Sequence, residues 1–272
     1  MSFRAAAVQM ASGPDRAANL ARASALVREA AAAGARLVAL PEMFTWRGSP
    51  GDEAQQAEPI PGPTTTALAT LARECGIVLC AGSILEAVPG ASRLHNTSCL
   101  FGPDGTLLAT YRKIHLFDVE LPGRVAARES AVFAPGERVV VADTPLCRAG
   151  LAICYDLRFP ELFRQLARQG AEVVLVPSAF TAPTGEAHWE LLCRARAIEN
   201  QCFLLAPNQS GPTRRGYAHW GHSLIVDPWG VVLAQASDGE AVVTAEIDLG
   251  TLARVRREMP CLAHVRLLPN PS

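Results

Sequence analysis

Hydrophobic runs rich in Val, Ile and Leu alternate along this chain with segments in which hydrophobic residues recur every three or four positions. The first pattern predicts buried strands, and the second predicts helices. The predicted strands cover residues 3–11, 35–42, 77–87, 138–145, 147–156, 172–178, 202–208 and 240–249. The predicted helices cover residues 15–34, 64–76, 160–170, 187–200 and 252–259, and the first has Asp15 as its N-cap and Gly34 as its stop. This alternation is typical of an α/β protein whose sheets are covered by helices.

Two hairpins change the sheet that we expect. Residues 95–113 form two strand-like runs around Pro103, Asp104 and Gly105, and residues 222–236 turn at 227–230. Because no linker or repeat interrupts the pattern, we expect one domain over residues 1–272, with a C-terminal tail at about 260–272. A doubly wound single sheet fits the pattern nearly as well. The hairpins favour an αββα sandwich of four layers, in which two mixed β-sheets pack face to face with helices on the outer faces.

Composition narrows the class of protein. Of the 272 residues, 49% are hydrophobic and 19% are charged, and the net charge is −1, which predicts a soluble globular protein that does not bind nucleic acid. The start "MSFRAAAVQM" lacks a signal-peptide pattern, and no stretch reaches the ~18 uninterrupted apolar residues of a membrane span. The eight cysteines include no CxxC pair, and "HWGH" has no second ligand pair. We therefore expect reduced thiols, no metal site, no membrane contact and a cytoplasmic location.

Reactive side chains stand where three predicted strands end. Glu42 ends "RLVALPE", Lys113 ends "LLATYRK", and Cys154 ends "AGLAICYD". Active sites of helix-covered sheets lie beyond the carboxyl ends of the strands, so these three groups can converge. Taken singly, each residue is also explained by structure: a solvated strand-end carboxylate, a surface lysine and a core cysteine.

The three groups together have a coherent chemistry. A thiol with a pKa of ~8.5 is favoured as thiolate by an ammonium, and a carboxylate can take its proton. Lys113 and the backbone N–H of Tyr155 can both donate to an oxyanion. Pro160 and Glu161 suit the first turn of a helix, whose positive end is expected to favour the Cys154 thiolate further.

Three segments carry a resemblance to a known family. "LPEMF", "YRKIHLFD" and "GLAICYDLRFPE", in that order, resemble the signature segments of the nitrilase superfamily, the carbon–nitrogen hydrolases, and the similarity extends from "AAAVQM" to "EIDL". The resemblance implies an αββα sandwich, a Glu–Lys–Cys triad at Glu42, Lys113 and Cys154, and a second carboxylate at Glu129. It implies no metal or organic cofactor.

Later segments narrow the branch. "PSAFTAPTGEAHWELLCRARAIENQC" and "GHSLIVDPWG" resemble the Nit branch, which includes deaminated glutathione amidase and omega-amidase. The implied reaction is hydrolysis of a small carboxylated amide, through a thioester, to an acid and ammonia. Arg158 is the candidate for the substrate carboxylate, with an internal ion pair to Glu161 or another acid as the alternative, and Phe180 and Thr184 are candidates to line the pocket. The resemblance also implies a homodimer or a higher homo-oligomer.

Two other functions remain open at this stage. Hydrolysis of an N-carbamoyl amino acid uses the same triad and differs in its products, because carbon dioxide is released with ammonia. A thiol redox sensor without turnover is the alternative outside enzymes, and it lacks a resolving cysteine close to Cys154 beyond Cys147. The sequence does not choose the natural substrate.

Overall fold

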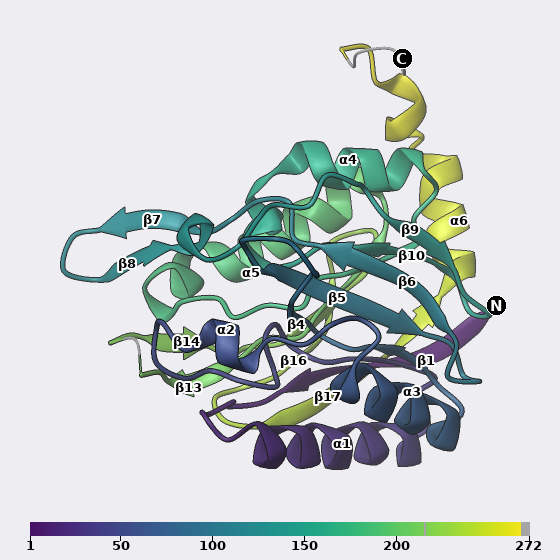
Figure 1. Cartoon of the computed structure of the whole chain (residues 1–272). Helices are drawn as coiled ribbons and strands as arrows, with labels where there is room; N and C mark the ends of the chain where they lie inside the picture. Colours follow the sequence, from purple (N-terminus) through teal and green to yellow (C-terminus); the bar gives the residue numbers. More distant parts are fainter. Residues whose placement is uncertain (215, 268–272) are drawn as a thin grey trace.

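Two large β-sheets pack face to face in the computed structural model, which describes residues 1–214 and 216–267, and helices cover both outer faces (Figure 1). The first sheet has the strand order β17-β1-β2-β3-β5-β4, with β6 paired to β5. Its strands are β1 (Ser2–Gln9), β2 (Leu37–Ala39), β3 (Val78–Cys80), β4 (Ile84–Glu86), β5 (His95–Phe101), β6 (Leu107–Arg112) and β17 (Ala241–Asp248). Strand β2 runs parallel to β1 and β3, and the other pairings are antiparallel, so the sheet is mixed as expected.

Side-chain alternation explains why this sheet is covered on both faces. In β1 and β2, Ala5 and Leu37 contribute to the core between the two sheets, whereas Ala6 and Val38 belong to a second core beneath the helices. The helices of this layer are α1 (Arg16–Ala32) and α3 (Pro63–Cys75). The Asp15 carboxylate caps α1 by accepting a hydrogen bond from the N–H of Ala18 at 3.0 Å, which confirms the predicted N-cap.

The second sheet has the order β16-β15-β12-β11-β10-β9. Its strands are β9 (Val141–Asp143), β10 (Arg148–Leu151), β11 (Val173–Leu175), β12 (Phe203–Ala206), β15 (Leu224–Val226) and β16 (Val232–Gln235). Strands β10, β11 and β12 are parallel, and helices α4 (Pro160–Arg168) and α5 (Ala182–Asn200) connect them. The αββα sandwich predicted from the two hairpins is therefore confirmed.

Smaller elements decorate this frame. They are α2 (Glu53–Gln56), α6 (Leu249–Glu258), the pairs β7 (Asp118–Leu121) with β8 (Val125–Arg128) and β13 (Ser210–Pro212) with β14 (Ala218–Trp220), and the 3₁₀ helices Glu129–Ala131, Cys154–Arg158 and Cys261–His264. The sequence pattern predicts no strand between residues 113 and 138, where an irregular segment was expected, but β7 and β8 form a hairpin there that projects from the body (Figure 1). Its turn contains Gly123 at φ 70°, a left-handed conformation that suits glycine.

The predicted tail begins with the last 3₁₀ helix, and residues 268–272 lie outside the described part of the chain. Among the helices of the described residues, none is both long and apolar enough to span a membrane.

Candidate active site

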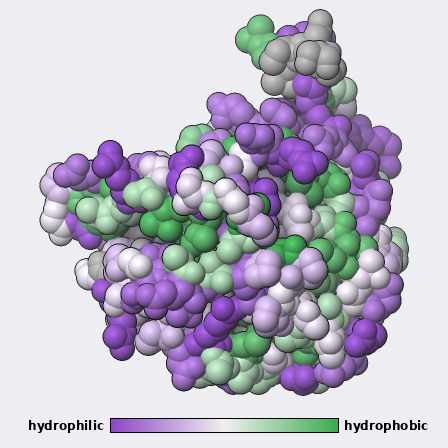
Figure 2. Space-filling view, in the orientation of Figure 1, coloured by the Kyte–Doolittle hydropathy of each residue, from purple (hydrophilic) through white to green (hydrophobic). Residues whose placement is uncertain are grey.

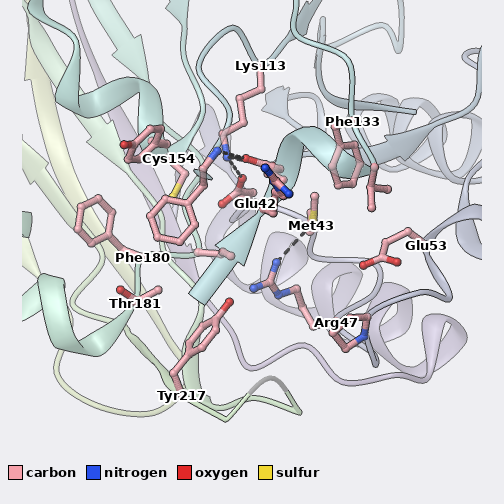
Figure 3. A pocket seen from close by; sticks show the side chains of 18 of the residues that line it. Glu42, Met43, Arg47, Glu53, Lys113, Phe133, Cys154, Phe180, Thr181 and Tyr217 are labelled. Atoms are coloured by element: carbon pink, nitrogen blue, oxygen red, sulfur yellow. Dashed lines mark hydrogen bonds and ion pairs between the residues drawn. The ribbon is translucent and has the colours of Figure 1, made fainter. Parts of the chain in front are cut away.

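The three reactive strand ends meet between the two sheets. Glu42 follows β2 and Lys113 follows β6, so both come from the first sheet, whereas Cys154 follows β10 of the second sheet. The three side chains point toward one another at one end of a cavity of 380 Å³ (Figure 3). The predicted convergence is therefore what the structure contains.

Lys113 lies at the centre of this cluster, and only 2% of its surface is exposed. Its Nζ donates to Oε1 of Glu42 at 2.9 Å and to Oε2 of Glu129 at 2.9 Å. Burial alone would lower the pKa of Lys113, but the negative charges of Glu129 and Glu42 raise it well above its ordinary value. The side chain is thus a fixed ammonium that cannot exchange protons near neutral pH.

Glu42 is held as a carboxylate despite its burial. Burial acts to raise its pKa, but the ammonium of Lys113, the guanidinium of Arg47 and hydrogen bonds with Lys113 and Cys154 lower it below 4.5. The backbone at this point is fixed from both sheets, because the Glu42 carbonyl accepts from Nε2 of Gln209 at 3.0 Å. An ionised carboxylate in contact with a thiol is a competent general base.

Cys154 has an unusual backbone conformation. Its φ of 45° lies in the left-handed region, which a residue with a Cβ adopts only under constraint, and such strain is concentrated at functional sites. Its N–H donates to the carbonyl of Pro177 at 2.9 Å, which fixes the turn between β10 and the following 3₁₀ helix.

The influences that favour a thiolate are outweighed at Cys154. Burial, followed by the charge of Glu42, raises the pKa of Cys154 far above its ordinary value, and the opposing effect of Lys113 is too small to reverse this. The resting side chain is therefore a thiol. A carboxylate that contacts this thiol, that of Glu42, is placed to accept its proton.

A candidate oxyanion site lies beside the sulfur. Tyr155 is the second residue of the 3₁₀ helix Cys154–Arg158, where the first N–H groups have no partner within the helix. Within residues 1–214 and 216–267 its N–H has no acceptor, so it is available to a substrate oxygen together with Lys113 Nζ.

Asn96 on β5 is a site residue that the sequence did not reveal. Its Nδ2 donates to Oε1 of Glu42 at 2.8 Å and to Oε1 of Glu129 at 3.3 Å. Glu129 also accepts from the N–H of Phe117 at 2.6 Å. Asn96 therefore separates and orients the two carboxylates that surround the lysine, and a lone asparagine inside a strand gives no sequence signal for this role.

Asp156 ties the two sides of the site together. Its fully buried carboxylate accepts from the N–H of His115 at 3.0 Å, from the hydroxyl of Tyr111 at 2.7 Å and from the N–H of Ile153 at 2.8 Å. His115 and Tyr111 flank the lysine in the chain, and Ile153 precedes the cysteine. One carboxylate thus joins the lysine segment to the cysteine turn, and the sequence analysis missed it.

The candidate substrate-binding residues Arg158, Phe180 and Thr184 all line the cavity. Arg158 does not pair with Glu161 or with another acid of the described residues, so that alternative is wrong. Its Nη1 lies 3.2 Å from Nδ1 of His188, and its guanidinium lies 5.0 Å from the centre of the Phe180 ring. Arg158 is thus a cation at the edge of the cavity.

No group of three or more His, Cys, Asp or Glu side chains suited to a metal ion occurs in residues 1–214 and 216–267. Hydrophobic surface gathers next to the β7–β8 hairpin in the view of Figure 2. Residues of β8, including Ala126 and Ala127, line the same cavity as Cys154. The hairpin that the sequence did not predict therefore forms part of the cavity wall.

The chain is similar to known proteins over nearly its whole length. Residues 4–257 match the family model described as carbon-nitrogen hydrolase. The chain is 45% identical over 265 residues to the Homo sapiens protein named omega-amidase NIT2, covering 97% of this chain and 95% of that protein. The crystal structure of Saccharomyces cerevisiae Nit3, a member of branch 10 of the nitrilase superfamily, aligns with a TM-score of 0.86 and 36% identity over 95% of this chain and 94% of that one.

A third similar protein has a solved structure in which its active-site cysteine is modified. An amidase from Nesterenkonia sp. AN1 aligns with a TM-score of 0.79 and 30% identity, over 95% of this chain and 98% of that one. In that structure acrylamide has added to the active-site cysteine of a mutant of the enzyme.

Proposed function

The chain belongs to the carbon-nitrogen hydrolase family, and from this premise we propose that it is an omega-amidase. It would hydrolyse the terminal amide of a small alpha-keto acid, such as alpha-ketoglutaramate, to the acid and ammonia. The observation that carries the proposal is the buried contact of Glu42 with both Lys113 and the Cys154 thiol inside one cavity. The resemblance to omega-amidases over nearly the whole chain supports the substrate class.

The first half of the proposed reaction makes a thioester. The Cys154 sulfur attacks the amide carbon while Glu42 takes the thiol proton, and the carbonyl oxygen becomes an oxyanion held by Lys113 Nζ and the Tyr155 N–H. The oxyanion then collapses, the C–N bond breaks, and Glu42 returns the proton to the leaving nitrogen, which departs as ammonia. The high pKa of the resting thiol requires this proton transfer to accompany the attack.

The second half uses the same groups. Water attacks the thioester carbon and gives a proton to Glu42, and the same two donors hold the new oxyanion. The C–S bond then breaks, the sulfur regains the proton, and the carboxylic acid leaves. Lys113 stays charged throughout because Glu129 and Glu42 hold its pKa high, so it acts by charge and hydrogen bonding alone. Glu129 would position Lys113 and the substrate amide and would not exchange protons.

The cavity suits a small charged amide. A volume of 380 Å³ lies within the range of small-molecule sites, roughly 300–1,000 Å³. Arg47, Arg128 and Arg158 line it together with Phe117, Phe133 and Phe180. A wall with both apolar rings and guanidinium groups fits a short carbon chain that ends in a carboxylate.

The test is a panel of amides assayed for ammonia release. It compares alpha-ketoglutaramate with deaminated glutathione, glutamine, a simple aliphatic amide and an N-carbamoyl amino acid. We expect a preference of ~100-fold for the keto amide, which corresponds to ~2.7 kcal/mol of transition-state stabilisation. A preference for deaminated glutathione would reassign the substrate, carbon dioxide release would identify a carbamoyl hydrolase, and reversible oxidation of Cys154 without ammonia from any amide would favour a redox sensor.

We also propose that the chain forms a homodimer or a higher homo-oligomer. The apolar residues of α4, which follows the nucleophile, are all buried and belong to the core or its margin: Leu162, Phe163, Leu166 and Ala167. Large apolar side chains are instead exposed on α5 and the β15–β16 hairpin, among them Leu191 at 69% and Trp229 at 59%. Light scattering is the test, and a monomer at micromolar concentration would contradict it.

The eight cysteines are all unpaired, which supports the cytoplasmic location that we propose.

A further inference from the structure

Arg47 lines the cavity, and in the proposed reaction it has no role beyond the effect of its charge on the pKa of Glu42. Its Nη2 lies 2.6 Å from Nε2 of His219, and its Nη1 lies 3.5 Å from the sulfur of Met43 (Figure 3). Its Nε is buried and has no hydrogen-bond partner. In the ion pairs of residues 1–214 and 216–267, Arg47 pairs with no carboxylate within 4.0 Å.

These contacts do not satisfy the full hydrogen-bonding capacity of the Arg47 guanidinium. Arginine offers five N–H donors in a planar fork that matches a carboxylate, whereas a thioether is a weak acceptor. A partly buried charge is normally paired, because taking it out of water is costly. Arg196, which is only 6% exposed, shows this pairing: its Nη1 lies 2.8 Å from Oε1 of Glu199.

The position of Arg47 suits the far end of a short substrate. Its charge is close enough to Glu42 to lower the pKa of that carboxyl group, so it lies near the reacting amide without touching the sulfur. Glu42, Met43 and Arg47 belong to one segment after β2, and Arg47 N–H donates to the carbonyl of Gly13 at 2.9 Å, which fixes the segment.

Arg158 is the other arginine that has to be weighed. Its guanidinium packs over the rings of Phe180 and Tyr155, at 5.0 and 5.7 Å, and it also contacts His188. Those ring faces already stabilise its charge through cation–π attraction. Arg47 has no such ring contact in the described residues, and its buried Nε has no hydrogen-bond partner.

We propose that Arg47 is the specificity-determining residue that binds the alpha-keto carboxylate, with its terminal nitrogens donating to the two carboxylate oxygens in place of the Met43 contact. The proposal rests on the proposed omega-amidase function. It assigns the carboxylate end of the substrate to the segment that follows the general base, and it leaves Arg158 at the edge of the cavity.

The experiment compares a charged amide with a neutral one. Wild type, Arg47→Gln and Arg47→Lys are assayed with alpha-ketoglutaramate and with pentanamide, which has the same number of carbons and no carboxylate. We expect Arg47→Gln to lower kcat/KM for the keto amide by 10- to 100-fold, mainly through KM, because a charge-assisted contact is lost. Arg47→Lys should lose less, since it keeps the charge without the fork.

Two effects of the substitution have to be separated. Loss of the Arg47 charge also raises the pKa of Glu42, but this shifts the acid limb of the pH profile equally for both substrates. The proposal requires a loss on the keto amide at least fivefold greater than the loss on pentanamide at the pH optimum. Equal losses would overturn it, and so would a selective loss in Arg158→Gln without one in Arg47→Gln.

Failure of the proposed function gives a different result. If the wild type releases no ammonia from alpha-ketoglutaramate, the omega-amidase proposal fails, and the carboxylate site is then judged by calorimetric binding of glutarate. Arg47→Gln should weaken that binding at least tenfold. Unchanged binding would overturn the Arg47 proposal, whatever the enzyme hydrolyses.

Discussion

Replacement of Glu42 by glutamine should separate the two roles of that side chain, general base and neighbour of the thiol. Glutamine has the same shape and keeps an oxygen that can accept from Lys113 and Asn96, whose donors lie at 2.9 and 2.8 Å. It cannot accept the thiol proton. The change therefore removes proton transfer and one negative charge while the packing of a buried site is preserved.

The loss of turnover follows from how often Glu42 is used. A positioned general base contributes typically 10²–10⁴-fold, or about 2.7–5.4 kcal/mol, and this carboxylate serves both half-reactions. We therefore expect kcat/KM for ammonia release to fall by about 10⁴-fold. In the wild type the lowered pKa of Glu42 keeps the base ionised down to below pH 4.5, so the acid limb of the profile should lie below that value.

The pKa of the Cys154 thiol should fall in Glu42→Gln. Burial raises the pKa of Cys154 and the Glu42 charge raises it further, whereas Lys113 lowers it. Removal of the Glu42 charge takes away the second cause, so the pKa falls while burial keeps it above the ordinary value. The pH at which iodoacetamide alkylation of Cys154 is half-maximal should therefore move to lower pH in an enzyme that no longer turns over.

The control is Glu161→Gln, the same chemical change at an exposed position in the first turn of α4. It should leave both turnover and alkylation at wild-type values. Turnover of Glu42→Gln within tenfold of wild type would refute its role as base, and an alkylation midpoint that moved to higher pH would refute the electrostatic reasoning.

Three other changes test separate parts of the site. Cys154→Ala should abolish ammonia release with unchanged circular dichroism, and residual turnover above 1% would contradict the nucleophile assignment. Glu129→Gln should leave Lys113 with one carboxylate, which should lower the free energy of unfolding by about 1–3 kcal/mol and lower kcat by at least tenfold. Denaturant titration and steady-state kinetics measure the two effects, and wild-type values in both would contradict the role of Glu129. Gly82→Ala should cost about 2 kcal/mol or more, because a Cβ at Gly82 (φ 56°) would lie 2.1 Å from the carbonyl oxygen of Pro41, and an unchanged melting temperature would count against that contact.

Much of this site could be predicted because its principal residues stand at strand ends. Glu42, Lys113 and Cys154 each follow a strand whose hydrophobic pattern is strong, so their positions relative to the sheets were fixed by local sequence. The β7–β8 hairpin was missed because Pro122 and Gly123 lie in a segment of weak hydrophobic alternation.

Other features depend on contacts that no local pattern records. Asn96 acts through hydrogen bonds to residues 54 and 33 positions away, and Asp156 joins the nearby Ile153 to residues 41 and 45 positions away. The raised pKa of Cys154 could not be predicted, because the sequence reveals which charges are near a thiol and not how completely water is excluded from it. Burial outweighs the lysine here, and burial is a property of the packed sandwich.

Because the site is divided between the two sheets, catalysis depends on the correct packing of one sheet against the other. Glu42 and Lys113 follow strands of one sheet, and Cys154 follows a strand of the other. A slight separation of the two sheets would therefore abolish the reaction, even though each sheet kept its own hydrogen bonds. On heating or in dilute denaturant, ammonia release should therefore be lost before circular dichroism detects unfolding.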